Sequence, residues 1–152
     1  MLDNLQKRKS DGFTIIEVMI VLAIAGLIML IIFLAVPALQ RNSRNTQYKN
    51  DAAAYGAAVA EWQQNNNGKT PASAADVTAI NGLVQLGKMT APTSVTAGAR
   101  TTTVTIGSME LNTGAKCSTT TVGDTVATSR AVAIRYSVET SSASSKQCID
   151  VN

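Results

Sequence analysis

Hydrophobic residues are concentrated in one long run near the start of the chain. Residues 1–12 are mostly polar, and the run Val18–Val36 that follows contains no ionisable residue over 19 positions. Nineteen helical residues span about 28 Å, which is close to the thickness of the hydrocarbon core of a bilayer. The pattern therefore predicts a helix long enough to cross a membrane.

After Pro37 the apolar positions become periodic. Apolar residues recur at alternating spacings of four and three, which is the spacing of one face of a helix. They are Tyr48, Ala52, Tyr55, Val59 and Trp62. The run Asn65–Gly68 then supplies residues that tolerate the left-handed conformation and end a helix. We expect one long helix from Phe13 to about Gln64, with its second half packed under a globular head.

Two residues weaken this helix. Gly26 lies within the apolar run, where glycine is a poor helix former. Pro37 follows the run, lacks a backbone N–H and predicts a bend or a local loosening. We expect flexibility at both positions.

The rest of the chain predicts a small β-rich head. Ser73 and Asp76 have the spacing of a capping box, which predicts a short helix from Ala74 to about Ile80. β-Branched or alternating residues predict strands at Thr101–Ile106, Glu110–Cys117, Ala131–Glu139 and Lys146–Val151. We expect a small antiparallel sheet on the second half of the long helix, and hence an α+β fold.

Composition and charge exclude several classes of function. The formal net charge is +3, and removal of residues 1–12, which hold three cations and two acids, would leave +2. This charge is too small and too scattered for nucleic acid to be a specific ligand. The chain has no histidine, so Ser-His-Asp and Cys-His sites are impossible. A carboxylate pair is not excluded, but nothing in the sequence brings two acids together. We expect no enzymatic activity, no cofactor and no metal site.

The two cysteines, Cys117 and Cys148, both follow the apolar run. Because the segment before that run is basic, we expect the N-terminus to stay in the cytoplasm and the head to cross the membrane. A disulfide is favoured there, although two free thiols also fit the sequence. A bond would close a loop of about 30 residues, worth roughly 3–4 kcal/mol in the chain-entropy model. Two cysteines without histidine cannot complete a tetrahedral zinc site.

One acidic residue lies at the edge of the apolar run. Glu17 directly precedes Val18, and a carboxylate there costs about 2–3 kcal/mol or more in a membrane helix unless it is compensated. One interpretation is a membrane-edge carboxylate that reaches the headgroups. Cleavage after Gly12 offers another, because it would give Phe13 a free amine one helical turn from Glu17.

The sequence around Glu17 resembles the start of type IV pilins. The segment Lys7–Leu22 reads KRKSDGFTIIEVMIVL. It is similar to the class III signal of that family, in which a basic leader ends in Gly and is followed by Phe, three residues, Glu and a long apolar helix. In that family a glycine and a proline bound the part of the helix that can lose order in the filament. Gly26 matches this glycine, whereas Pro37 lies later in the chain than the proline of many members. The two cysteines resemble the pair that bounds the C-terminal region of many members.

The resemblance implies processing by a prepilin peptidase, which would cut between Gly12 and Phe13 and methylate the Phe13 amine. Glu17 would then pair with the Phe13 amine of a neighbouring subunit. The implied organisation is a cytoplasmic leader at 1–12, a transmembrane and filament-core helix at 13–39, its amphipathic continuation at 40–67 and a head at 68–152.

The resemblance also implies a location and partners. The subunit would lie in the cytoplasmic membrane, within the lipid bilayer, before assembly. Inner-membrane pilus assembly machinery would then move it into an extracellular helical filament of identical subunits that serves motility, adhesion or DNA uptake.

Two other interpretations stay open. A pseudopilin of a type II secretion or competence system would share the N-terminal motif, although the cysteine pair and the Ser/Thr-rich head favour a pilus. A single-span membrane protein with an extracytoplasmic binding domain would explain the apolar run, but not the Gly12–Phe13 pair or the position of Glu17. The mass of the mature chain separates this last class from the other two.

Overall fold

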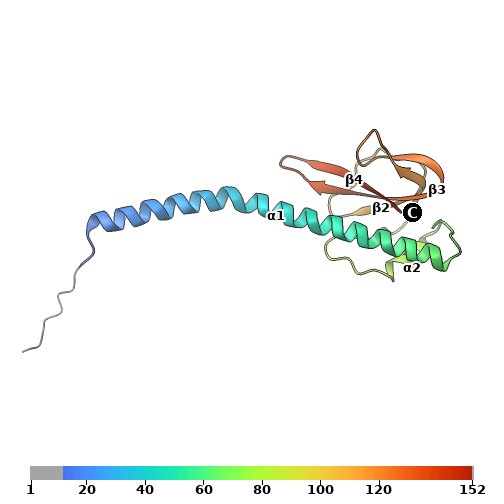
Figure 1. The fold of residues 1–152 in the computed structure, drawn as a ribbon, viewed down its shortest axis with the longest axis horizontal. Coiled ribbons are helices and arrows are strands. Elements are labelled where there is room, and N and C mark those ends of the chain that lie inside the picture. The colour runs from blue at the N-terminus through green and yellow to red at the C-terminus, as the bar shows by residue number, and fades with distance from the viewer. Residues whose placement is uncertain (1–11, 152) are drawn as a thin grey trace, which may run out of the picture. The chain divides into compact units, whose positions relative to one another are not determined.

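A computed structural model describes residues 12–151 (Figure 1). Its elements are α1 (Ile15–Asn65), α2 (Ala74–Asn81), β1 (Val95–Ala97), β2 (Met109–Cys117), β3 (Thr125–Glu139) and β4 (Ser144–Val151). The chain divides into two compact units between Ala38 and Leu39, so α1 contributes to both. The expected α+β class is confirmed.

The first unit is an apolar helix that no other part of the described chain covers. Every described residue from Gly12 to Ala38 is exposed, and α1 is the one described helix that is long and apolar enough to cross a bilayer. The helix continues through Pro37. Residues 1–11 of the predicted leader lie outside the described residues. An exposed apolar surface of this extent requires lipid or other apolar chains around it.

The predicted apolar stripe forms the centre of the core in the second unit. All five of its residues are buried, and Ala52, Tyr55 and Val59 have no exposed surface. They join a single cluster with buried residues of α2 and the sheet, among them Val77, Ile80, Leu111, Val132, Ile134 and Val151. The expectation that the sheet covers the second half of the long helix is therefore confirmed.

The sheet is mixed, not purely antiparallel. Its strand order is β1-β2-β3-β4, and the pairs β2/β3 and β3/β4 are antiparallel as expected. The short strand β1 pairs in parallel with β2, with Val95 opposite Leu111. The sequence does not predict β1, because three residues carry too little pattern to distinguish a strand from a loop.

The segment Thr101–Ile106 is not a strand, so that prediction is wrong. It crosses the outer face of β3, and side chains of β3 bind its carbonyl groups. Ser137 Oγ donates to the Val104 carbonyl at 2.7 Å, and Arg135 Nη2 donates to the Thr102 carbonyl. Val104 is also buried. The β-branched residues of the segment Thr101–Ile106 cover a face of the sheet. β-Propensity does not distinguish a segment that covers a sheet from a strand that pairs within it.

The ends of both helices have the predicted chemistry. Asn67 and Gly68 have φ of 57° and 71°, and the Gly68 N–H donates to the Gln63 carbonyl at 2.7 Å, which closes α1. At the start of α2, Ser73 Oγ accepts the N–H of Asp76, and the Asp76 carboxylate accepts the N–H of Ser73 at 2.9 Å. The predicted capping box and short helix are confirmed.

Candidate functional site: the start of α1 and the anchors of the head

Glu17 is bound by Thr14 at the first turn of α1. Its carboxylate Oε2 accepts the backbone N–H of Thr14 at 2.8 Å and the Thr14 hydroxyl at 2.7 Å. The Thr14 hydroxyl in turn accepts the N–H of Glu17 at 3.3 Å. This reciprocal arrangement is a capping box. In the single subunit, the carboxylate therefore already has partners on its own helix.

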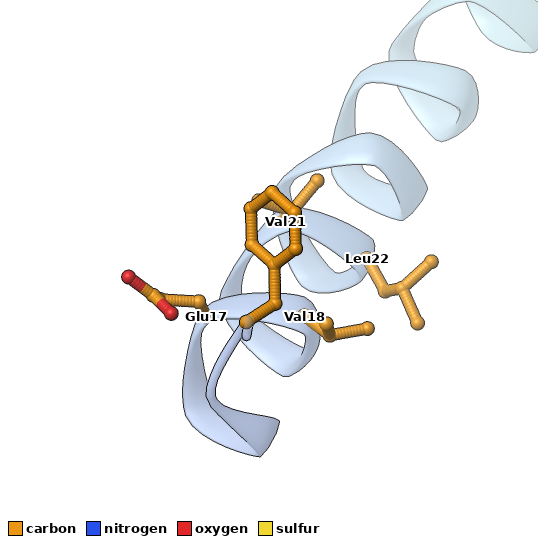
Figure 2. Close-up of a pocket in the computed structure, with 5 residues that line it drawn as sticks. Glu17, Val18, Val21 and Leu22 are labelled. Carbon is orange, nitrogen blue, oxygen red and sulfur yellow. The ribbon is translucent and has the colours of Figure 1, made fainter. Parts of the chain in front are cut away.

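An apolar hollow lies beside this carboxylate. It has a volume of about 470 Å³ and is lined by Phe13, Glu17, Val18, Val21 and Leu22. The carboxylate points away from the side chain of Leu22 (Figure 2), and Phe13 is 88% exposed. The start of α1 thus presents a charged group and an apolar surface in different directions.

The other predicted residues of this helix have open surroundings. A Cβ added at Gly12 or Gly26 would meet nothing within 4 Å, and Pro37 lies inside α1. Packing within the described chain therefore does not require glycine at position 26. Cleavage and methylation at Gly12–Phe13, flexibility at Gly26 and Pro37, and assembly through Glu17 stay predictions.

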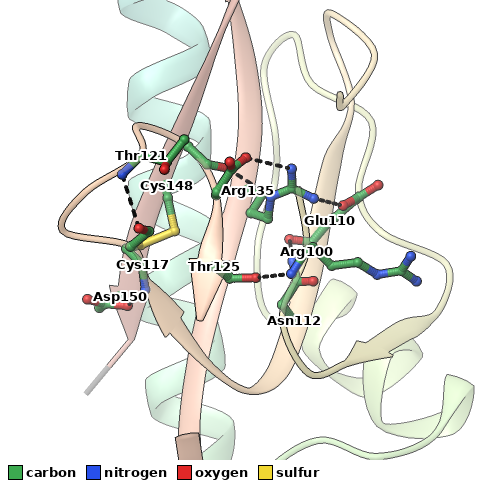
Figure 3. The surroundings of a disulfide bond; sticks show 12 residues. Arg100, Glu110, Asn112, Cys117, Thr121, Thr125, Arg135, Cys148 and Asp150 are labelled. Carbon is green, nitrogen blue, oxygen red and sulfur yellow. Dashed lines mark hydrogen bonds and ion pairs between the residues drawn. A yellow bond between two sulfur atoms is a disulfide. The ribbon is translucent and has the colours of Figure 1, made fainter. Parts of the chain in front are cut away.

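Cys117 and Cys148 form a disulfide between β2 and β4 (Figure 3). Their Cα atoms are 5.7 Å apart, although β3 lies between these strands in the sheet. The cysteines meet because the hairpin of β2 and β3 bends where its register shifts after Thr113. Gly114 lies at this bend with φ of 62°, a conformation that favours glycine.

Asp150 supports the disulfide. Its carboxylate and both sulfur atoms lie within 4.8 Å of one another, a grouping that would resemble a metal site if the thiols were free. Both sulfur atoms are committed to the disulfide, and Asp150 Oδ1 accepts the N–H of Cys117 at 2.6 Å. We therefore assign Asp150 to holding the end of β2 against β4.

Arg135 is fully buried on the outer face of β3 (Figure 3). Its Nη1 donates to Glu110 at 2.8 Å and its Nε donates to the Gly123 carbonyl at 2.9 Å. Nη2 lies 3.8 Å from the Asp124 carboxylate. A buried guanidinium is tolerated only when its donors are matched in this way. Arg135 therefore holds the loops that cross this face against the sheet.

Asp51 fixes the loop that follows α2. Its carboxylate accepts the N–H groups of Gly87, Lys88 and Met89 at 3.0, 2.7 and 2.8 Å. Burial acts to raise the pKa of Asp51, but the three backbone hydrogen bonds outweigh burial and hold the pKa below its ordinary value of 3.8. The ionised form of Asp51 is thus the form that holds the loop.

Glu139 fixes the turn between β3 and β4 to α1. Arg44 Nε and Nη2 donate to the Glu139 carboxylate at 2.9 and 2.6 Å. The Asn45 side chain donates to the Glu139 carbonyl at 2.7 Å and accepts its N–H at 2.8 Å. The hydrogen bond from Arg44 holds the pKa of Glu139 below its ordinary value. We call Arg44, Asn45 and Glu139 the hairpin clamp.

Sequence reasoning missed most of these anchors. Periodicity places Arg44 and Asp51 off the apolar stripe, and such polar positions are normally solvated. Their partners lie at least 36 positions away for Asp51 and 95 positions away for Arg44, so no local pattern indicates them. The capping box of Thr14 and Glu17 was detectable, because its spacing of three is a known helix-start signal.

The first part of the chain matches one family. Residues 7–33 match the prokaryotic N-terminal methylation motif. Comparisons with curated proteins and with solved structures gave no match. The motif points to a structural, pilin-type family whose members are normally without enzymatic activity, and together with the apolar helix it supports anchoring in a membrane before assembly. The motif, at the start of the exposed apolar part of α1, supports a type IV pilin-like prepilin with a class III signal.

Proposed function

We propose that this protein is a structural subunit of a type IV pilus, assembled through α1 into an extracellular filament. The observation that carries the proposal is the methylation motif at the start of an apolar helix that is exposed from Gly12 to Ala38. Such a helix is stable in a bilayer, or in a bundle of like helices that pack closely. The proposed sequence of events is insertion, cleavage after Gly12, methylation of the Phe13 amine and transfer into the bundle.

Glu17 sets the register of the bundle in this proposal. Cleavage would create an amine on Phe13, next to the cap formed by Thr14 and Glu17. In an apolar core, an unpaired amine or carboxylate is strongly penalised, so the offset that pairs Glu17 with a neighbour's Phe13 amine is favoured over others. The hydrogen bonds from Thr14 keep the carboxylate satisfied until that partner arrives.

A pseudopilus would use the same helix start. The disulfide and the Ser/Thr-rich surface of the head support an exposed surface fibre. The test is to shear fibres from the cell surface and measure the masses of their proteins. We expect the mature chain, beginning at Phe13 with one added methyl group, as a main component. A mature chain confined to membranes would indicate a pseudopilin, and a chain beginning at Met1 would contradict both functions.

A further inference from the structure

A polar hollow lies at the C-terminal end of α1, within the head. It has a volume of about 370 Å³ and is lined by Asn67, Gly68, Lys69, Thr70 and Arg130. Four lining residues come from the loop after α1, and Arg130 comes from β3. Two segments distant in the sequence thus bring two cations to one hollow.

Arg130 reaches this hollow from an irregular part of β3. The strand pairs with β2 at Ala127 and again at Val132, and the register shifts between these positions. Arg130 lies in the interruption with φ of 88°. This backbone conformation is strained for a residue with a side chain and is easily adopted by glycine. An interruption that turns an arginine toward a hollow, at a position better suited to glycine, points to a role for the side chain.

Neither cation has an ionic partner among the described residues. The acid that acts on Lys69 through space is Asp76. Its carboxylate already accepts the N–H groups of Ala72 and Ser73 at 2.9 Å. Two of the five lining residues are cationic and none is acidic, so the charge presented to the hollow is positive. Arginine and lysine are the side chains that best bind phosphate and carboxylate groups.

A second hollow of about 370 Å³ adjoins the first through Gly68. Its other lining residues are Ala60, Gln63 and Gln64. Side-chain amides both donate and accept hydrogen bonds, which suits hydroxyl groups. Hollows of this size are in the range of small-molecule sites, which begin at about 300 Å³.

We propose that these two hollows bind a sugar unit that carries an anionic group. Lys69 and Arg130 would hold the phosphate or carboxylate, and the amides and Thr70 would hold the hydroxyl groups. The site lies in the head and does not involve the assembly helix. The proposal therefore stands whether the subunit belongs to a pilus or to a pseudopilus.

The test uses the full chain with its disulfide intact, in polyoxyethylene detergent micelles that contain no sugar or phosphate. Glucose 6-phosphate, glucuronate, glucose and inorganic phosphate are titrated separately, and amide chemical shifts are recorded. We expect at least one anionic sugar to give saturable shifts centred on residues 67–70 and 130, and glucose to give none. The stronger of the two anionic sugars identifies the preferred anionic group.

Variants separate the site from folding and from overall charge. Arg130→Gly should weaken binding about tenfold or more, as expected for loss of a charged hydrogen bond, while it raises the thermal midpoint by removing the strained φ. Lys69→Gln should weaken binding similarly, and Arg130→Lys should retain part of it. Lys116→Gln, at an exposed lysine of β2, is the control with the same change of charge and should bind normally.

Three results would overturn the proposal. The first is no saturable shift with any anionic sugar at tens of millimolar. The second is equal affinity for inorganic phosphate and glucose 6-phosphate together with no binding of glucuronate, which would leave no role for the sugar. The third is equal weakening by Lys116→Gln, which would indicate general charge attraction without a site.

Discussion

The carboxylate of Glu17 accepts both the backbone N–H and the hydroxyl of Thr14. The residue that we expect to align neighbouring subunits is therefore also part of the capping box of its own helix. The capping box needs the Thr14 hydroxyl as well as Glu17, whereas the proposed pair between subunits needs only the charge of Glu17. Substitutions at the two positions can separate them.

Glu17→Ala should block or sharply reduce assembly while cleavage after Gly12 continues. Removal of the charge eases insertion into the membrane, but it leaves the Phe13 amine unpaired in every subunit. By analogy with broken buried pairs, this costs about 3–5 kcal/mol per subunit. The measurement compares cleaved subunit in membranes with subunit in sheared fibres, with the variant as the only copy.

Thr14→Val is the matched control for that experiment. It removes the capping hydroxyl, at a cost of about 0.5–2 kcal/mol, and keeps the carboxylate, so fibres should still form. Normal fibre yield with Glu17→Ala would reduce Glu17 to a capping residue. Loss of fibres in both variants would show that the helix start, and not the ion pair, limits assembly.

A bulky residue at Gly12 should leave full-length precursor in the membrane. We expect little room for a side chain in a peptidase cleft close to the bilayer, so Gly12→Val should prevent cleavage. Gly26→Ala is the control, because a Cβ at that position meets nothing within the chain and lies away from the cleavage point. N-terminal sequencing decides the outcome, and efficient cleavage of Gly12→Val would contradict the expected requirement.

Loss of the disulfide should destabilise the head without preventing membrane insertion. Cys117→Ser or Cys148→Ser should lower the free energy of unfolding by about 2–5 kcal/mol and reduce the amount of surface fibre. The double variant should be no less stable than the single variants, since they remove the same bond. Peptide mapping without reductant should find the two peptides linked in the native protein. Free thiols in native fibres would refute this assignment.

The anchor at Asp51 should make stability depend on pH. Its pKa is lowered in the folded state, so its contribution is complete well above pH 3.8 and is lost as the pH falls through the folded pKa. Asp51→Asn should cost about 1–3 kcal/mol at neutral pH and flatten the acid part of the profile. Urea unfolding between pH 2 and 7 measures both effects.

Two other groups bear on the Asp51 experiment. Glu139 and Asp76 also have lowered pKa values, so some loss of stability in acid should persist in the variant. Glu61→Gln, at an exposed acid of α1, controls for the change of net charge. An unchanged acid profile in Asp51→Asn would show that Asp51 does not hold the loop through its ionised form.

Arg135→Met should destabilise the head by about 1–3 kcal/mol, because it leaves the buried Gly123 carbonyl and the part-buried Glu110 carboxylate without their donor. The loops over the outer sheet face should also become more sensitive to protease. Adding Glu110→Gln should recover part of the loss by removing one uncompensated carboxylate, whereas Glu110→Gln alone should destabilise. Additive effects of the two substitutions in denaturant unfolding would show that the residues are not coupled.

The sequence predicts the parts of this fold that local patterns encode. The stripe from Tyr48 to Trp62, the cap at Ser73 and most of the three longer strands follow from patterns within one element. The exception is the start of β3, which lies at Thr125, six residues before the predicted Ala131. The covering segment Thr101–Ile106 and the parallel strand β1 do not, because their positions depend on Arg135, Ser137 and β2, which lie far along the chain. At the helix start, the motif predicts candidate residues, and their roles depend on partners outside the single subunit.

The hairpin clamp has a mechanical consequence. Arg44 and Asn45 join α1 to Glu139 within about two turns of Leu39, where the helix enters the head. A pull along the helix therefore reaches the head at the turn between β3 and β4, where Arg41 donates to the Ser141 carbonyl at 3.4 Å, and then at the end of β3. That strand is paired with β4 from Val132 to Glu139. Tension parallel to two paired strands acts on all the hydrogen bonds between them at the same time. The clamp thus spreads a force applied to one helix over the strands that hold the head closed.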